Sequence, residues 1–292
     1  MRRVPGTRYG CEVPDENRRG ALVEISEAMA PGWERRRARI DGAVAPVREW
    51  LVRALAPAPG DTVLELAAAS GDTGLDAAAA VGEGGRLIAT DLTPAMVEIG
   101  RRRAAEVRAR NVEHRVMDAE RIDLPDGSVD GVLCRFGYML MVDPAAALAG
   151  TRRVLRPGGR VALAVWGPPE RNPWLAIGGA ALQERGHVPP PDPGEPSPFA
   201  MASAERILAM LAEAGLKGAR VEEVPVVWAY RDAEDYIEIM SDTAPVGRVI
   251  RGLPAGERDE LRRRLEAAFA PFASGDGLAV PGVALCALAE AP

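Results

Sequence analysis

Two segments of small and acidic residues follow apolar runs of the sequence, and their residue types suit the recognition of a nucleoside. The first is the turn after the run at 61–67, and it contains Glu65, Ala67, Ala68, Ala69, Ser70 and Gly71. Small side chains there let a ligand approach the backbone, although alanine-rich turns also occur without any ligand. The second is Asp91, twenty positions after Gly71, where a carboxylate can accept hydrogen bonds from both hydroxyls of a ribose. Asp91 is equally placed to cap a helix that begins near Thr93, so both interpretations stay open.

Two later segments extend this pattern. Asp118 and Ala119 follow the apolar run at 112–117, where a carboxylate can accept a hydrogen bond from an adenine amino group and Ala119 offers its backbone N–H. Arg135 follows the run at 129–134. In an open parallel sheet the ligand lies beyond the carboxyl ends of the strands, near the point where the strand order reverses. The four segments are therefore predicted to converge on one ligand site.

Apolar runs and helical stretches alternate through the middle of the chain. The predicted strands are 61–67, 86–90, 112–117, 129–134 and 160–166, and the predicted helices are 72–80, 94–109 and 144–155. Thr93 can cap the second helix, and Pro94 suits its first turn; Pro157–Gly159 are expected to stop the third. Because such alternation with short loops is typical of a parallel sheet with right-handed crossovers, the predicted fold class is doubly wound α/β.

The flanking segments are less regular. Residues 1–20 are predicted to form a loose tail, and two helices at 22–30 and 32–55 are expected to be separated by Pro31 and Gly32. Beyond the fifth strand, the pattern predicts helices at 174–185 and 202–214, a proline-rich loop at 189–198, an outer strand at 219–230, a largely helical stretch at 232–273 and a last strand at 278–289. Pro225 favours an edge position for the outer strand.

Composition and charge exclude several classes of protein. The 292 residues include 36 basic and 42 acidic side chains, and this balance argues against sequence-independent binding of nucleic acid. The crowded arginines within 35–39 form either a solvated helix face or a binding surface. Cys11, Cys134 and Cys286 show no metal-ligand spacing and only two histidines exist, so no metal is expected, and the thiols are predicted to be reduced in a cytoplasmic protein. No signal peptide or membrane span is predicted.

Five sequence motifs, in order and at family spacing, resemble those of class I S-adenosylmethionine-dependent methyltransferases, in particular the subgroup related to ubiquinone and menaquinone biosynthesis. They lie within the segments VLELAAASG, IATDLTPAMVEIGRRRA, VMDAERIDLPDGSVDGVLCRFG and RVLRPGGRVALAVW. The resemblance runs from about Val63 to Gly167, roughly a third of the chain, and extends more loosely to its end. It implies a Rossmann-like methyltransferase fold, with a seven-stranded, mostly parallel sheet and helical lid insertions.

The resemblance also implies how the chain is divided. Residues 1–55 would supply an N-terminal arm and lid helices, and 56–167 the cofactor-binding core. Residues 168–292 would complete the sheet and carry lid insertions at about 168–200 and 232–273. All three parts would form one catalytic domain.

By the same resemblance, the cofactor is S-adenosylmethionine and the product is S-adenosylhomocysteine. Ala67, Ala69 and Gly71 stand where the family usually has three glycines, and the two alanines are a departure. The expected cofactor-binding residues are Glu65, Ala67, Ala68, Ala69, Ser70, Gly71, Asp91, Leu92, Met96, Asp118, Ala119 and Arg135. Glu65 would organise the loop, and Arg135 would contact the methionine end chiefly through its backbone.

The expected reaction is methyl transfer to an O, N or C nucleophile of a small molecule. The arginine-rich, alanine-rich composition is typical of GC-rich genomes and is compatible with specialised metabolism. A base helps when the acceptor is a hydroxyl, and His187, Glu170 and Asp143 are candidates with no support beyond their position. The candidate acceptor-pocket residues are Trp33, Phe136, Tyr138 and Trp166, each of which could instead be ordinary core.

Two other functions compete with methyl transfer as interpretations of the sequence. A nicotinamide dehydrogenase would need the G-x-G-x-x-G spacing, which the turn at 65–71 lacks. A homologue of the same fold that binds the cofactor without methylating, or that has lost activity, stays open because of Ala67 and Ala69. No nucleic-acid or membrane partner is expected, and a homodimer is one option for the oligomeric state.

Overall fold

The computed structural model describes residues 15–190 and 195–292. Predictions for residues 1–14, including Cys11, and for 191–194 of the proline-rich loop lie outside the described residues. In chain order the elements are α1 (Asp15–Leu55), β1 (Thr62–Leu66), α2 (Asp72–Val81), β2 (Arg86–Asp91), α3 (Pro94–Glu106), β3 (Val112–Val116), β4 (Val129–Arg135), α4 (Pro144–Val154), β5 (Leu155–Trp166), α5 (Pro173–Glu184), α6 (Ala204–Glu213), β6 (Lys217–Tyr230), α7 (Ala233–Thr243), α8 (Gly247–Gly252), α9 (Ala255–Phe269), β7 (Ala273–Ser274) and β8 (Gly277–Glu290).

The sheet has the strand order β3-β2-β1-β4-β5-β8-β6, and the two-residue β7 pairs with β8 beside this path. Strands β1 to β5 pair in parallel, whereas β8 is antiparallel to both of its neighbours. The chain moves outward from β1 in one direction through β2 and β3, and in the other through β4 and β5. Right-handed crossovers then place helices on opposite faces, which confirms the predicted doubly wound sheet with seven main strands.

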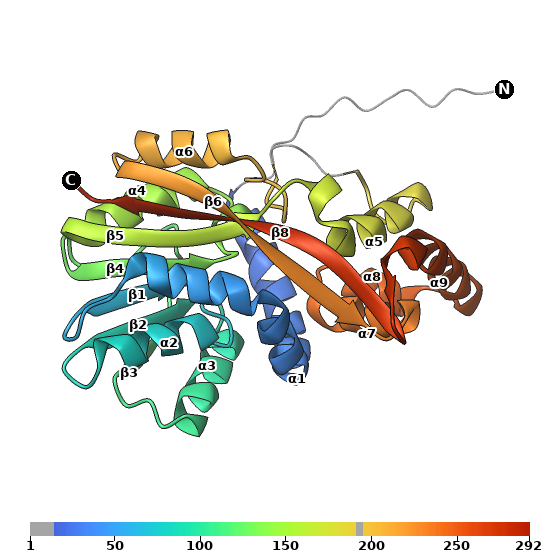
Figure 1. Ribbon diagram of the computed structural model, residues 1–292, viewed down its shortest axis with the longest axis horizontal. Helices are drawn as coiled ribbons and strands as arrows, with labels where there is room; N and C mark the ends of the chain where they lie inside the picture. The colour runs from blue at the N-terminus through green and yellow to red at the C-terminus, as the bar shows by residue number, and fades with distance from the viewer. Residues whose placement is uncertain (1–14, 191–194) are drawn as a thin grey trace.

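The predicted edge position of β6 is also confirmed. Strand β6 pairs with β8, and both extend well beyond the parallel strands (Figure 1). Helices α5, α7, α8 and α9 are grouped around this extension at one end of the molecule (Figure 1). Pairing continues along the extension from Pro225 opposite Val283 to Tyr230 opposite Leu278. The stretch at 232–273 is therefore a helical insertion carried by a β-hairpin.

The structure corrects the predicted start of the fifth strand. Helix α4 ends at Val154, one residue before the predicted end, but β5 begins directly afterwards at Leu155. Val129 of β4 pairs with Leu155, and two residues later Gly131 pairs with Arg160, so β5 contains a bulge. Pro157–Gly159 lie in this bulge, where Gly158 has a φ of 78°, and do not form a separate loop.

The prediction of two helices before the first strand is wrong, because α1 is one helix of 41 residues with Pro31 and Pro46 inside it. It begins at Asp15, so part of the predicted loose tail at 1–20 is helical. Gly32 is explained by packing: a Cβ there would lie 2.0 Å from the backbone oxygen of Asp242 at the end of α7. The Pro31-Gly32 pair thus marks a close crossing of two helices and does not end the first.

The crowded arginines of α1 are neither a solvated face nor an open binding surface. Arg35 and Arg36 donate to Asp242 of α7 over 2.8 and 2.9 Å. Arg39 donates to both carboxylate oxygens of the buried Asp235, also on α7. Arg37 turns the other way and donates to Asp72 at the start of α2 over 3.1 Å. These ion pairs join α1 to α7 of the helical insertion and, through Arg37, to α2.

One large group of buried apolar side chains runs from α1 through the sheet to α9. Cys134 and Cys286 are free thiols within it, and burial raises the pKa of each to about 12. Within residues 15–190 and 195–292, no helix is long and apolar enough to cross a membrane, and no three His, Cys, Asp or Glu side chains gather as metal ligands.

Candidate functional site

The turn after β1 has the backbone shape that glycines usually supply, although two of its residues are alanines. Ala67, Ala69 and Gly71 have φ values of 52°, 47° and 76°. A left-handed conformation costs an alanine about 1–2 kcal/mol, so the surrounding contacts must impose it. The Ala68 amide donates to Thr90 of β2 over 2.9 Å, and the Gly71 amide donates to Ala68 over 2.7 Å. The predicted ligand-binding turn is therefore a strained loop held by the sheet.

Asp91 braces this loop from the end of β2. Its carboxylate accepts from the Ala69 amide over 2.9 Å and from the Thr93 amide over 3.4 Å. The N-cap of α3 is Thr93, whose hydroxyl accepts from the Met96 amide, so the alternative role of Asp91 as the helix cap is filled by another residue. An ionised carboxylate has about four acceptor sites, which leaves Asp91 able to accept from further donors.

Glu65 lies at the end of β1 and is 2% exposed. Its Oε1 accepts from the Gly74 amide over 2.9 Å, which ties the strand to the first turn of α2. Its Oε2 is buried without a hydrogen-bond partner. Burial raises the pKa of Glu65 to about 8, although the positive charge of Arg135 acts in the opposite direction.

Ser70 and Asp72 continue the loop into α2. The Ser70 hydroxyl donates to Asp72 over 2.8 Å. Asp72 is also buried, and it accepts from Arg37 of α1 over 3.1 Å and from Arg103 of α3 over 3.0 Å. This carboxylate therefore links three helices at the mouth of the candidate site, a role that its position in the sequence did not reveal.

The first turns of α1 lie across the segments that follow β2 and β3. Arg19 donates to Glu120 and lies 3.6 Å from Asp118, measured from Nε to Oδ2. Asp118 also accepts from the Glu120 amide over 2.9 Å. Further along α1, Glu27 accepts from the Ala95 amide over 3.4 Å. The predicted adenine-binding segment is thus covered by a helix that the sequence motifs do not include.

Apolar contacts complete this cover. Ala30 of α1 forms a buried cluster with Met96 and Ile99 of α3, and Trp33 and Ala69 pack against it. The predicted residues Leu92 and Ala119 are half-buried nearby in the chain, at the ends of β2 and β3. The structure therefore brings the loop after β1, the start of α3 and α1 together around one region.

Three charged side chains from two elements, α1 and β4, meet beside the loop. Arg135, at the end of β4, has a side chain only 9% exposed, and its Nη1 lies 3.6 Å from Oδ1 of Asp41 on α1. Arg48, two turns further along α1, places Nε 3.4 Å from the same oxygen. Sequence reasoning missed Asp41 and Arg48. Their seven-residue spacing on one helix face was the available signal, but nothing in the sequence linked that face to β4.

An aromatic row leads away from the end of β4. Phe136 stacks on Trp166 with ring centroids 3.9 Å apart, and Trp166 meets the edge of Trp174 at 4.9 Å. Trp174 in turn stacks on Trp228 of β6 at 4.2 Å. Phe136 is half-buried with a φ of 60°, whereas Trp166 is buried. Of the predicted acceptor-pocket residues, these two are the pair that the structure joins.

The other two predicted pocket residues are placed differently. Tyr138 is fully buried, and its hydroxyl lies 2.6 Å from the hydroxyl of Thr151 on α4. Tyr138 therefore packs on the following helix, which is the alternative that the sequence left open, and the short turn at Tyr138–Leu140 directs it there. Trp33 donates through Nε1 to the backbone oxygen of Thr243 over 3.1 Å, so it also anchors α1 to the end of α7.

The three candidate bases have structural partners or lie in solvent. His187 lies 3.3 Å from Glu257 of α9, which also pairs with Arg185. Glu170 is exposed. Asp143 is exposed and caps α4 by accepting from the Ala146 amide over 2.9 Å. Among the described residues, no hydrogen bond or ion pair joins any of the three to the loop after β1 or to Arg135.

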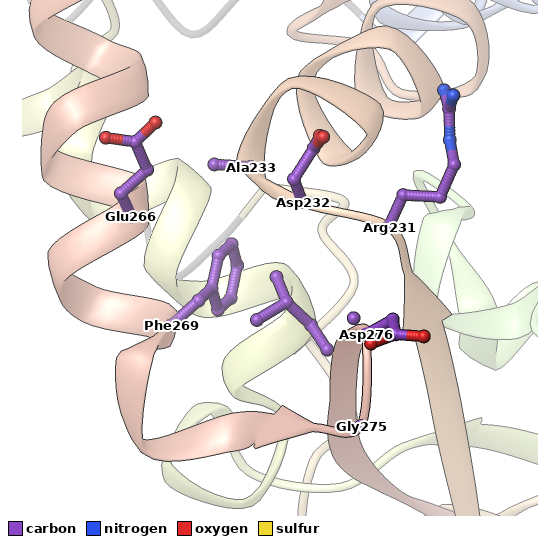
Figure 2. Close-up of a pocket in the computed structure, with 9 residues that line it drawn as sticks. Arg231, Asp232, Ala233, Glu266, Phe269, Gly275 and Asp276 are labelled. Atoms are coloured by element: carbon purple, nitrogen blue, oxygen red, sulfur yellow. The ribbon is translucent and has the colours of Figure 1, made fainter.

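Two surface cavities lie away from these segments. One, of about 390 Å³, is lined by Arg231, Asp232, Glu266, Phe269 and Asp276 among others, between α7, α9 and the end of the β6–β8 hairpin (Figure 2). The other, of about 860 Å³, adjoins Arg86 and Val112 at the amino ends of β2 and β3. Neither includes a predicted site residue, and ligands of open α/β sheets bind at the carboxyl ends.

Comparison with known proteins places this geometry in a family. A family model for the methyltransferase domain matches residues 63–159. The chain is 44% identical over 78 residues to the ubiquinone/menaquinone biosynthesis C-methyltransferase UbiE of Acidiphilium cryptum, covering 26% of this chain and 31% of that protein. It is 36% identical over 91 residues to a demethylmenaquinone methyltransferase of Thermus thermophilus, covering 30% and 40%. The chain thus matches less than half the length of these relatives.

Solved structures agree on the fold. The YcgJ protein of Bacillus subtilis aligns with a TM-score of 0.56 at 20% identity, covering 83% of this chain and 97% of that one. The [4+2]-cyclase SpnF aligns with a TM-score of 0.59 at 14% identity, covering 93% and 96%. Together with the strand order, these findings show that the chain has the class I methyltransferase fold and that residues 63–159 match a methyltransferase domain, with distant homology to the ubiquinone and menaquinone methyltransferases.

Proposed function

We propose that this chain transfers the methyl group of S-adenosylmethionine to a small-molecule acceptor. The observation that carries the proposal is the loop after β1, where Ala67, Ala69 and Gly71 all take the left-handed conformation and the Asp91 carboxylate braces the Ala69 amide. A strained loop that persists without glycine at two positions is held in that shape by its surroundings, and such strain is concentrated at binding sites.

The residues present fit the cofactor. Asp91 keeps acceptor capacity for ribose hydroxyls, and Asp118 and Ala119 would hold adenine at the end of β3, after Asp118 exchanges its contact with Arg19. Leu92 and Met96 would line the adenosine. The loop 67–71, with Ala68 and Ser70, would face the methionine portion together with Glu65 and Arg135.

When bound, S-adenosylmethionine supplies a methyl group already activated on a sulfonium. The work left to this chain is alignment of the acceptor and exclusion of water. The α1 helix and the insertion at 232–273 would cover the site, as one catalytic domain with the sheet. Phe136 and Trp166 would form an apolar wall for the acceptor, with Trp33 near the cover.

The test is calorimetric titration of the purified chain with S-adenosylmethionine and S-adenosylhomocysteine. We expect micromolar binding that Asp91→Ala weakens at least tenfold, about 1.4 kcal/mol. Asp126→Ala removes an exposed carboxylate paired with Arg153 and should leave the affinity unchanged. Failure of the unaltered chain to bind either compound would overturn the proposal.

Turnover separates the proposal from its alternative, a homologue that binds the cofactor without methylating. Incubation with S-adenosylmethionine and panels of phenols, amines and activated carbon acids should produce S-adenosylhomocysteine with at least one class. Tight binding with no turnover across all classes would favour the alternative. The same panel identifies whether oxygen, nitrogen or carbon is the accepting atom.

A further inference from the structure

Four buried atoms of ionisable side chains near the loop after β1 lack a hydrogen-bond partner. They are Oε2 of Glu65, Oδ1 of Asp41, Nη1 of Arg135 and Nε of Arg48. Glu65 is 2% exposed and the Arg135 side chain 9% exposed, so both are more than nine-tenths buried. Buried polar atoms in folded proteins are almost always hydrogen-bonded. A group of exceptions in one place therefore calls for a specific explanation.

These atoms belong to one cluster that spans three elements. Asp41 Oδ1 is at its centre, 3.6 Å from Arg135 Nη1 and 3.4 Å from Arg48 Nε. Glu65 and Asp41 are also the carboxylates whose negative charges act most strongly on Arg135. Arg48 is held from outside the cluster, where its Nη1 donates to Asp76 of α2 over 2.8 Å. The ion pairs are thus close enough for attraction, yet their geometry leaves donors and acceptors free.

The acidic and basic nature of these four side chains indicates which kind of ligand they could bind. Two carboxylate oxygens can accept from a cationic group, and two guanidinium nitrogens can donate to an anionic group. A ligand that carries an ammonium and a carboxylate on one carbon presents both within a few ångströms. The amino-acid portion of S-adenosylmethionine has this chemistry.

We propose that Asp41 of α1 acts with Glu65 and Arg135 to recognise the α-ammonium and α-carboxylate of the cofactor, with Asp41 and Glu65 facing the ammonium and Arg135 facing the carboxylate. The proposal rests on the proposed function. Under this proposal Asp41 of α1, a helix outside all the sequence motifs, binds the charged end of the ligand. Arg135 then contributes through its side chain as well as through its backbone.

The ionisation of Glu65 offers a second readout. Arg135, Asp72 and Asp91 are the charged groups that face it, and burial holds its pKa at about 8. At pH 7 the carboxyl is therefore largely protonated without ligand. An ammonium placed beside it would favour the carboxylate, and the proton would leave to the buffer.

The experiment compares S-adenosylhomocysteine with 5′-methylthioadenosine, which lacks the amino-acid end. By calorimetry, Asp41→Asn should weaken S-adenosylhomocysteine at least tenfold and change 5′-methylthioadenosine less than twofold. Glu34→Gln is the matched control, an acid-to-amide change two turns earlier on α1 at a residue paired with exposed Arg102. It should alter neither affinity by more than twofold.

Titrations at pH 7 in two buffers of different ionisation enthalpy should show release of a proton with S-adenosylhomocysteine and none with 5′-methylthioadenosine. Equal weakening of both ligands by Asp41→Asn, or no weakening, would overturn the inference and indicate that ordered water fills the cluster. If the unaltered chain binds 5′-methylthioadenosine as tightly as S-adenosylhomocysteine, only this inference fails. If it binds neither, the proposed function fails with it.

Discussion

Glu65 and Asp91 in one region of this molecule and Asp235 in another are all buried carboxyl groups, yet their pKa values are shifted in opposite directions. In the cofactor half, defined as β1–β4 with α2 and α3, burial raises the pKa of Glu65 to about 8 and also raises that of Asp91. In the lid half, defined as β6–β8 with α7–α9, Asp235 is equally buried. Burial would raise its pKa too, but hydrogen bonds from Arg39 and Arg231 outweigh that effect and lower it to about 2.

The difference lies in the partners. Glu65 and Asp91 accept hydrogen bonds from backbone amides and have no side-chain donor within hydrogen-bond distance among the described residues. Asp235 is neutralised by guanidinium groups that the fold itself supplies. A carboxyl that is desolvated and not neutralised costs stability, and such groups are concentrated at functional sites. Glu65 and Asp91 therefore cost stability and stay available to a ligand, whereas Asp235 stabilises the lid half through its ion pairs with arginines.

The largest expected effect tests the cofactor half through pH. Because the folded pKa of Glu65 lies above its unfolded value, its stabilising contribution is complete below pH 4.5 and is lost as the pH rises through 8. Between pH 5 and 8 this one group should remove on the order of 4 kcal/mol from the free energy of unfolding. Glu65→Gln should flatten that decline, as measured by urea unfolding of the ligand-free protein at four pH values. If the free energy of unfolding fell equally with pH in both proteins, ionisation of the buried Glu65 would not cause the decline.

The next effect tests the lid half. Asp235→Asn leaves Arg39 without its bidentate partner and should cost about 3 kcal/mol at pH 7. Because the folded pKa is lowered, the contribution of Asp235 is present above pH 3.8 and lost as the pH falls through 2. Glu238→Gln on the same helix, at a residue with longer and more exposed pairs, should cost less than about 0.5 kcal/mol. Similar losses for both variants would show that Asp235 is not a specific fastener.

A smaller effect concerns the close crossing between α1 and α7 of the lid half. Gly32→Ala would place a Cβ 2.0 Å from the backbone of Asp242, so α1 and α7 must separate, at a cost of about 2 kcal/mol. Gly42 lies on the same helix with nothing within 4 Å of a built Cβ, and Gly42→Ala should stabilise by about 0.5–1 kcal/mol. Thermal unfolding of both variants should therefore shift in opposite directions, and a shift in the same direction would contradict the close crossing.

The smallest effect concerns the strained loop. Ala69→Gly relieves the left-handed conformation, partly offset by the extra freedom of glycine in the unfolded chain, and should stabilise by about 0.5–1 kcal/mol. Ala68 has no left-handed φ, so Ala68→Gly should destabilise by a similar amount. If chemical denaturation showed Ala69→Gly to be the more harmful of the two, the loop would adopt a different shape in solution.

The cofactor half was largely predictable from the sequence, because buried parallel strands produce short apolar runs between turn residues. Strands β1 to β4 lie within about one residue of their predicted positions. Asp91 could be singled out for the same reason, since position after a strand determines position in the site. The alanine positions followed from the motif, but their left-handed φ values required the structure.

The rest could not be predicted, because long-range packing decided it. The local preferences of proline and glycine predict that the helix ends at Pro31-Gly32. The helix nevertheless continues through this pair, where Gly32 packs closely against α7. Asp41 reaches the site from a helix that precedes the first strand, and no spacing rule connects it to Arg135. Phe136 and Tyr138 both follow β4 and are two residues apart. The turn there directs the ring of Phe136 toward Trp166 and that of Tyr138 toward Thr151, and this difference could not be predicted from the sequence.

Pro31 has one more consequence, which concerns the hydrogen bonding within α1 itself. Pro31 has no amide hydrogen to donate to the carbonyl of Glu27, so α1 lacks one of its backbone hydrogen bonds there. The segment before Pro31 touches the adenine side through Arg19 and Glu27, while the segment after it is fastened to α7 by Arg35, Arg36 and Arg39. Pro31 is therefore a position where the backbone of α1 is less restrained by its own hydrogen bonds, and it separates two segments of the helix that contact different parts of the molecule.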